Sequence, residues 1–436
     1  MGIPVKNVGY ARAGRRSRVL QTAWLGDQFG VQFFVLATPT FLKARHAPPG
    51  TLALFASLSL LWCLRGVLVP PLLGLLPVRM RVERLLHLVL VSRCVMLVHF
   101  LVLAAALSGV TDVARLERLL FLSGIVICTL SGVERGLLES ASVLTADARS
   151  RGSALHLALS GSTGVVLAWI VCNGVVLPVE DRFGIAAAAV MMSLAIALLS
   201  VPLLSTAVRV ADAQARELDQ VALPMGDGGA DRRAWHGGAP EVLKRTARLT
   251  LVLMVGWIGM DLAWRIAQPL MTSQGMTLTS IGAVGAFTSC GLLALAALAW
   301  LRAGKRMRRR IGFKSACETL ALFAVCALAI TGFRGGAAYA MVGYTALQIG
   351  YFCFNVFTTE FLIRYGQMFE SPGGVVSAAA VAYFCAHFAV VPILYFASQV
   401  PHGYGVIVML AGIMLLLWKL GVERILPEFA DVGGHG

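Results

Sequence analysis

Charged side chains within long apolar stretches are the residues of this sequence that could do chemistry. A charge at the centre of a membrane-spanning helix costs roughly 2.5 to 3.5 kcal/mol, so it usually faces a partner, a bundle interior or a water-filled path. The pattern therefore indicates transfer of protons or of a charged solute. Such residues near the middle of stretches are Asp27, Arg65, Arg93, Asp261, Arg265 and His387, and those nearer a stretch end are Glu134, Arg135, Glu139 and Glu360.

Asp27 is the leading candidate for proton coupling. Gln28 and Gln32 lie close to it, and no cation within one helical turn balances its charge. We expect its partner to be Arg65 or Arg93 on a neighbouring helix. Burial and an adjacent arginine act on a carboxyl group in opposite directions, and together they can hold it where a proton binds and leaves. A structural salt bridge between helices is the alternative for Asp27.

Two pairs of opposite charge have the spacing of one helical turn. Asp261 and Arg265 are able to neutralise each other locally, without any role in transport. Arg135 and Glu139 lie near a helix end where long side chains reach water, and with Glu360 they are predicted to form a gating network at the cytoplasmic end. The complete set of predicted proton-coupling residues is Asp27, Asp261 and Glu134.

Arginine, amide and aromatic side chains in the same stretches are predicted to bind solute. A guanidinium group binds a carboxylate through two parallel hydrogen bonds, so buried arginines suit an anionic solute. Tryptophan rings can stack on a solute, although packing or interfacial anchoring is commoner for any one of them. A lone histidine in an aromatic span is more typical of helix packing. The predicted solute-binding residues are Arg65, Arg93, Arg265, Gln28, Gln32, Trp24, Trp257 and His387.

Twelve apolar stretches must position these residues. Hydrophobic residues make up 58% of the 436 residues and charged residues 14%, whereas soluble domains carry nearer a quarter charged residues. Each stretch has about the 20 residues that an α-helix needs to span a membrane with its backbone hydrogen-bonded internally. The sequence predicts an all-α membrane protein with 12 spans near 19–42, 51–76, 85–107, 116–138, 154–177, 183–208, 247–271, 278–301, 313–333, 338–362, 375–398 and 404–422.

A polar segment at 209–246 divides the stretches six and six. We predict two six-helix bundles, residues 1–208 and 247–436, joined by a cytoplasmic linker loop at 209–246. With both termini cytoplasmic, the inner segments and the helix ends that adjoin them hold 27 Lys and Arg residues and the outer ones hold six, as the positive-inside rule expects. The net charge of +15 is thus explained by topology, and nucleic-acid binding is not expected.

The first helices of the two bundles are weakly similar in sequence. Trp24-Leu25-Gly26-Asp27 in one corresponds to Trp257-Ile258-Gly259-Met260-Asp261 in the other, and a proline follows each near the outer end. A duplicated unit would place the two aspartates at equivalent positions, facing a shared cavity at the membrane midplane.

Signatures of enzymes, pumps and metal sites are missing from the sequence. It has no Gly-x-x-x-x-Gly-Lys-Ser/Thr loop for ATP, no Gly-x-Ser-x-Gly elbow and no His-Glu-x-x-His motif. All nine cysteines fall in predicted spans without a Cys-x-x-Cys pair, so neither a disulfide framework nor a zinc site is indicated. We predict a protein that is not an enzyme and has no cofactor or metal; a polytopic membrane enzyme is a weaker alternative.

Short motifs carry a family resemblance. Residues 62–72 have Trp62, Arg65 and Pro71-Leu72, and residues 131–152 have Glu134-Arg135, Glu139 and a closing Arg151-Gly152. With the Gly259 and Asp261 of the seventh stretch and the six-plus-six layout, these resemble the major facilitator superfamily, most of all its branch of muropeptide permeases and inner-membrane siderophore permeases. Two positions depart from that pattern: Gly74 stands where the family usually has Asp, and Arg135 reverses a charge.

The resemblance implies a proton-driven permease of the bacterial inner membrane for a mid-sized polar solute. With the buried arginines, we predict a monomer that moves a polar or anionic organic solute by alternating access. A ferric siderophore is the favoured solute. The alternatives are a muropeptide permease and a siderophore or drug exporter. The departures at Gly74 and Arg135 keep open a different class, a non-transporting membrane scaffold or assembly factor that has lost the coupling residues.

Overall fold

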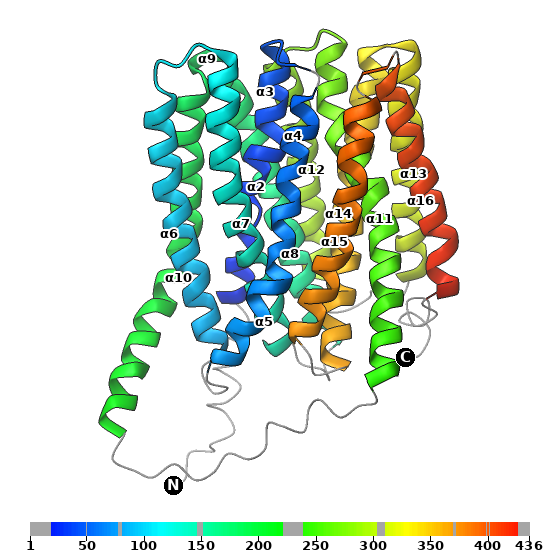
Figure 1. The fold of residues 1–436 in the computed structure, drawn as a ribbon. Coiled ribbons are helices and arrows are strands. Elements are labelled where there is room, and N and C mark those ends of the chain that lie inside the picture. Colours follow the sequence, from blue (N-terminus) through cyan, green and yellow to red (C-terminus); the bar gives the residue numbers. More distant parts are fainter. Residues whose placement is uncertain are drawn as a thin grey trace.

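The computed structural model describes residues 19–48, 50–76, 81–145, 151–220, 239–302, 310–368, 372–397, 399–400 and 402–425, which are mostly helical. The helices stand side by side as a bundle (Figure 1). In chain order they are α2 (Phe29–Gln32), η1 (Phe33–Ala37), α3 (Thr38–Ala44), α4 (Thr51–Ser57), η2 (Leu58–Leu64), α5 (Arg65–Leu75), α6 (Arg81–Leu107), α7 (Val113–Thr145), α8 (Arg151–Val171), η4 (Cys172–Val176), α9 (Leu177–Phe183), α10 (Ile185–Gln220), α11 (Ala239–Ser273), α12 (Leu278–Arg302), α13 (Arg310–Arg334), α14 (Ala337–Met368), α15 (Pro372–Ala397) and α16 (Gly403–Ile425).

All twelve predicted apolar stretches are mostly helical where the structure describes them, with a turn at residues 26–28 in the first. Within those parts of the chain, ten helices are long and apolar enough to cross a membrane, and Ala321–Arg334, the C-terminal part of α13, is a shorter apolar segment. The first stretch is missing from this set because it is broken into short pieces. These helices indicate a multi-pass membrane protein, while the count of twelve spans and the cytoplasmic termini stay predictions.

The helices that border the predicted linker loop are longer than their apolar cores. α10 continues to Gln220 and α11 begins at Ala239, so both enter the segment predicted at 209–246. The lower part of α10 projects beyond the bundle (Figure 1). Apolar length marks only the part of a helix that lies in lipid, so it cannot locate a helix end in water. Residues 221–238 lie outside the described part, and the division into two bundles stays a prediction.

The first stretch is interrupted at residues 26–28, and Asp27 lies in the interruption. Residues 19–25 are helical, and α2 begins again at Phe29 after a turn in which Gln28 has a left-handed φ of 79°. Backbone groups freed by such a break inside a membrane need other partners. Arg93 of α6 supplies one, because its guanidinium donates to the carbonyl oxygen of Ala23.

Two glycines allow neighbouring groups to approach this break. A Cβ on Gly26 would overlap the guanidinium of Arg93, and a Cβ on Gly164 of α8 would overlap the carbonyl oxygen of Trp24. A guanidinium can swing aside, but a backbone carbonyl is fixed by its helix. The close contact of α8 with the broken helix therefore requires glycine at position 164.

Helical geometry is also irregular in three later pieces. η1 and η4 are π-helices and η2 is a 3₁₀-helix. Each π-helix is followed by a proline in the first turn of the next helix, Pro39 in α3 and Pro178 in α9. Proline donates no N–H, and its ring crowds the preceding turn, which explains the wider turn before it. Such π-helical turns are frequent at functional sites.

Helices from before and after the linker pack directly on one another. α8 contacts α12 and α14, and α15 contacts α4, η2 and α5. Following the predicted topology, we call the end of the bundle with the connections at 45–50, 108–112 and 274–277 the outer end and the opposite end the inner end (top and bottom of Figure 1).

The close approach at Gly164 gives a stability prediction. Gly164→Ala is expected to lower the free energy of unfolding by about 1 to 3 kcal/mol, the usual cost of overpacking, because a backbone oxygen occupies the place of the new methyl group. Thermal unfolding of the purified protein in detergent measures this. The control is Gly291→Ala in α12, where a Cβ meets no described atom within 4 Å. Equal stability of the two variants would contradict the prediction.

Candidate functional site

Four buried charged side chains meet beside the broken helix, and we call Asp27, Arg65, Arg135 and Glu139 the central cluster. Nη1 of Arg135 lies 2.6 Å from Oδ2 of Asp27, and Nε of Arg135 lies 3.0 Å from Oε1 of Glu139. Oε2 of Glu139 lies 3.6 Å from Nε of Arg65. Two carboxylates face two guanidinium groups, so the ionised cluster carries no net charge. Neutrality of this kind is what makes buried charges tolerable in a membrane.

Arg135 is therefore the partner of Asp27, and the expectation of Arg65 or Arg93 was wrong. The local pair of Arg135 with Glu139 was correctly predicted, but α7 also packs against α2, which brings the same guanidinium to Asp27. One arginine thus joins two carboxylates that lie 112 positions apart in the sequence. The gating role predicted for Arg135 and Glu139 stays a prediction.

The central cluster also reaches across to helices that follow the linker. Nη2 of Arg135 donates to Oγ1 of Thr359 in α14 at 3.3 Å. The guanidinium carbon of Arg135 lies 4.5 Å from the centre of the Trp24 ring, and Nε1 of Trp24 donates to Ser142 at 2.9 Å. Trp24, predicted to contact solute, thus holds the arginine in place in this arrangement.

Arg65 differs from the other arginines of the bundle interior. Its guanidinium carbon lies 5.2 Å from the ring of Trp62 and 4.9 Å from the ring of Tyr383 in α15. The residue is only 1% exposed, yet Nε and Nη1 have no hydrogen-bond partner within the described part of the chain. Its nearest ion-pair contact is the 3.6 Å separation from Glu139. Arg65 is thus a buried cation with unused donors, between helices that precede and follow the linker.

Arg93 and Glu134 form a separate pair. Nη2 of Arg93 lies 2.6 Å from Oε1 of Glu134 and also donates to the carbonyl oxygen of Ala23, while Nη1 donates to the carbonyl oxygen of Leu199. The guanidinium therefore ties α6 to α7, α10 and the broken helix. Its donors are occupied by protein groups, so this geometry favours a structural role for Arg93 over the predicted contact with solute.

A third charged group lies in α11 and α15. Nε of Arg265 is 2.6 Å from Oδ2 of Asp261, as their spacing predicted, and Nδ1 of His387 is 3.2 Å from the same oxygen. Arg265 also donates to Oγ of Ser59 in η2. Asp261 and Asp27 thus each pair with an arginine, but Asp27 lies in a turn and Asp261 inside a continuous helix.

Aromatic rings link these charged groups to the outer end. Trp257 lies 4.3 Å from Tyr383, and Trp264 lies 5.0 Å from Tyr351, measured between ring centres. Trp169 of α8 stacks on Trp264 at 4.4 Å. Rings from both sides of the linker therefore meet here, and the predicted solute-binding residue Trp257 belongs to this group.

Polar side chains near the outer end form a network that the sequence did not single out. Oγ1 of Thr40 donates to Oε1 of Gln268 at 3.0 Å, and Nε2 of Gln268 lies 2.7 Å from both Oδ1 of Asn173 and Oη of Tyr344. All four residues are fully buried, and we call them the outer cluster. Asn173 and Gln268 are polar residues in apolar stretches, but neutral amides and hydroxyls are less conspicuous there than charged side chains because they cost less to bury.

The remaining predicted residues lie at the edges of these groups. Nε2 of Gln28 donates to Asp27 at 3.2 Å, and Nε2 of Gln32 donates to Gln28 at 3.3 Å, so both amides extend the central cluster. Glu360 lies 2.5 Å from Arg364 and is partly exposed, and its predicted part in a gating network with Arg135 and Glu139 stays a prediction.

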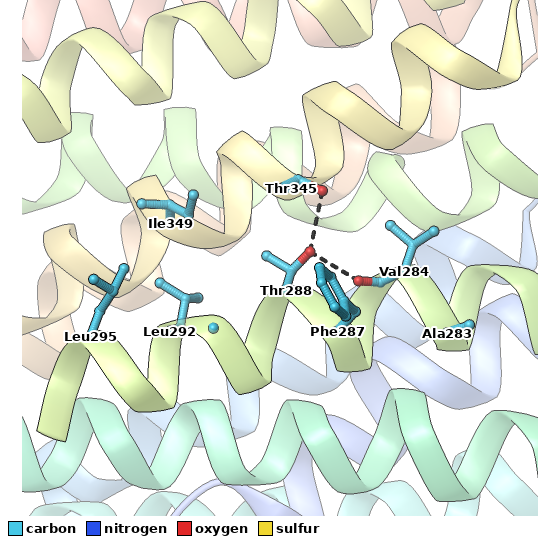
Figure 2. Close-up of a pocket in the computed structure, with 9 residues that line it drawn as sticks. Ala283, Val284, Phe287, Thr288, Leu292, Leu295, Thr345 and Ile349 are labelled. Atoms are coloured by element: carbon cyan, nitrogen blue, oxygen red, sulfur yellow. Dashed lines mark hydrogen bonds between the residues drawn. The ribbon is translucent and has the colours of Figure 1, made fainter.

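A groove between α12 and α14 has a different character (Figure 2). Its wall includes Phe287, which is 84% exposed, and none of the residues that line it is charged. Oγ1 of Thr288 lies 3.2 Å from Oγ1 of Thr345 and donates to the carbonyl oxygen of Val284. Its surface suits lipid chains rather than a charged solute.

Comparison with known proteins places the fold but not the family. The sequence matches no protein-family model and no curated protein. Solved structures match almost the whole chain. A variant of the peptide transporter POT in complex with alafosfalin shares 13% identity with a TM-score of 0.53, and covers 95% of this chain and 92% of its own.

Two other structures are similar to the same extent. A POT family transporter in complex with 5-aminolevulinic acid shares 10% identity with a TM-score of 0.57, and one in complex with a thioalcohol-conjugated peptide shares 11% with a TM-score of 0.57. Each covers 95% of this chain and 97% of its own. The predicted branch of muropeptide and siderophore permeases is not confirmed, and the chain has the fold of these transporters.

Proposed function

We propose that this protein is a proton-coupled secondary transporter of a bacterial inner membrane, which moves a mid-sized polar or anionic organic solute by alternating access. The observation that carries the proposal is Arg65. A buried guanidinium with unused donors is costly unless an anion binds it. It lies beside Trp62 and Tyr383, on helices from opposite sides of the linker. A site shared between two bundles is the place where transporters of this kind bind solute.

Contacts at both ends of the bundle support alternating access. At the outer end, Thr40 and Asn173 bond to Gln268 across the boundary between helices before and after the linker. Toward the inner end, Arg135 bonds to Thr359 across the same boundary. Opening toward either side of the membrane requires only one of these groups of hydrogen bonds to break. Each contact contributes about 0.5 to 3 kcal/mol, so binding of solute or protons can shift the balance between them.

Charge balance in the central cluster supports coupling to protons. The cluster is neutral without solute, so an anion bound to Arg65 would leave one uncompensated negative charge in the membrane. A proton on Asp27 or Glu139 would restore neutrality. Oδ1 of Asp27 and Oε2 of Glu139 are free of hydrogen bonds within the described residues, so either can accept that proton. Solute and proton would then move together.

The solute that suits this site carries at least one carboxylate or similar anion. The free carboxylate oxygens beside Arg65 would also accept bonds from an amino group, so amino acid derivatives and short peptides are the first class to test. The transporters of similar fold are named with such solutes, 5-aminolevulinic acid and a conjugated peptide. Siderophore uptake, favoured from the sequence, gains no support from these similarities and stays a second class. Muropeptides are a third, and a siderophore or drug exporter follows.

The test of function is uptake into proteoliposomes that contain the full chain, with a pH gradient imposed. The probes are labelled dipeptides, iron-loaded siderophores and muropeptides, each selected first by stabilisation of the purified protein against heat. A ligand at 100 times its Kd stabilises by about 2.7 kcal/mol. If no probe stabilises the protein or enters the vesicles, the non-transporting scaffold becomes the better explanation.

Arg65 is expected to bind the anionic group of the solute. Arg65→Gln removes a charge-assisted hydrogen bond worth about 1.5 to 3 kcal/mol, so solute affinity should fall about 10- to 100-fold, while Arg65→Lys should retain part of it. Ligand-induced stabilisation measures the affinity. The matched control is Arg118→Gln, an exposed arginine outside the site that loses the same charge. Unchanged affinity in Arg65→Gln would contradict the assignment.

Asp27 is expected to couple solute to protons. With Asp27→Asn the empty cluster becomes positive, so an anion can bind without a proton. Exchange of solute between the two sides of the vesicle should continue, whereas accumulation driven by a pH gradient should be lost. The exposed Asp112→Asn serves as control. Accumulation at the wild-type level in Asp27→Asn would exclude Asp27 as the coupling group.

A further inference from the structure

Glu180 is a buried carboxylate outside the site described above. It lies in α9 near the outer end, and its side chain is fully buried. Neither Oε1 nor Oε2 has a hydrogen-bond partner among the described residues. The other buried carboxylates in the described parts, Asp27, Glu134, Glu139 and Asp261, each lie within 3.0 Å of an arginine nitrogen. Glu180 therefore stands apart from the pairing that governs the rest of the bundle.

We propose that Glu180 is a proton-binding site of the transport cycle, protonated while the outer end is closed and ionised when it opens. This rests on the proposed function for its place in a cycle. The physical reason is that an ionised carboxylate without a partner is far more costly to bury than a neutral carboxyl group. Closing the outer end over Glu180 thus requires it to take up a proton.

No cation in the described part of the chain is hydrogen-bonded to Glu180. α9 packs against α3, α10, α12 and η4. Asp181 and Arg182 are exposed, so water lies one or two residues from Glu180 along the chain. Asp181 accepts a hydrogen bond from Thr279. The other titratable side chains described on these elements are Lys43, Cys172, Asp181, Arg182 and Cys290. None of them bonds to Glu180.

The position of α9 links Glu180 to the outer cluster. α9 continues directly from η4, and η4 carries Asn173, which bonds to Gln268 in α11. Both pieces pack against α12, where a Cβ on Gly285 would lie 2.6 Å from the Asn173 side chain. Separation of the helices at the outer end must therefore move η4 and α9 away from α12. The same movement would admit water to Glu180.

Linkage fixes the direction of the pH effect. Proton binding stabilises the state in which Glu180 is buried, so acid conditions favour a closed outer end and alkaline conditions favour an open one. The proton is taken up from the outer side, because that is the side on which α9 meets water. A group that only packed the helix would not change the balance between the two states.

The test needs no solute, so it is independent of whether transport is found. Infrared spectra of the full chain in lipid nanodiscs report the carbonyl band of a protonated carboxylic acid. Spin labels on Arg45→Cys and Tyr339→Cys report the distance between two exposed outer-end positions, one before and one after the linker. The native cysteines are removed in this protein. In wild type we expect the band at neutral pH. As the pH rises, the band should disappear over the same pH range in which the distance between the labels increases.

Variants separate this proposal from a packing role. Glu180→Gln should lack the band and keep the short label separation at every pH, whereas Asp181→Asn should behave as wild type. A missing band in wild type, or a label separation in Glu180→Gln that still responds to pH as in wild type, would overturn the proposal. If Glu180→Gln fails to fold, the wild-type comparison decides: a band and a separation that change over different pH ranges would also overturn it.

Discussion

The cost of an unpaired charge in a membrane governs the interior of this protein. Arginines that would be prohibitive alone are tolerated because carboxylates meet them at 2.6 to 3.0 Å, as in the pairs Arg93 with Glu134 and Arg135 with Asp27 and Glu139. Such pairs add little net stability, but breaking one leaves an uncompensated buried charge. The arrangement of helices is therefore constrained by which charges must meet, and any change in that arrangement must keep the balance.

That constraint also explains why the exceptions have functional interest. Arg65 holds unused donors, and Glu180 holds unused acceptors, in places that are closed to water. The proposals give each group what it lacks, an anion for Arg65 and a proton for Glu180. The two groups lie in different parts of the fold. Arg65 belongs to the central cluster, and Glu180 lies in α9, which ends just before Gly184. The proposed transport would depend on such incomplete groups, since a fully satisfied interior has nothing to exchange with a solute.

The broken first helix connects these electrostatics to the backbone. Asp27 lies in the break, Arg93 bonds to the carbonyl oxygen of Ala23 just before it, and Gly164 allows α8 to lie against it. A helix with free backbone groups is unstable in lipid, so this one persists only because neighbouring helices satisfy it. Solved transporters with at most 13% identity have the same overall fold. Fold in this class thus depends on helix lengths and order more than on particular side chains.

The sequence by itself determined the apolar helices, the residues whose charges lie inside them and the local pairs at i,i+4 spacing, because these follow from composition and helical period. It did not reveal the break at Asp27, since no proline marks it, nor the buried position of Glu180, which it left outside a span. Only the tertiary structure decided that Arg135 rather than Arg65 or Arg93 bonds to Asp27. The physical reason is that partners 108 residues apart are chosen by how helices pack, and apolar lengths carry no information on which faces meet.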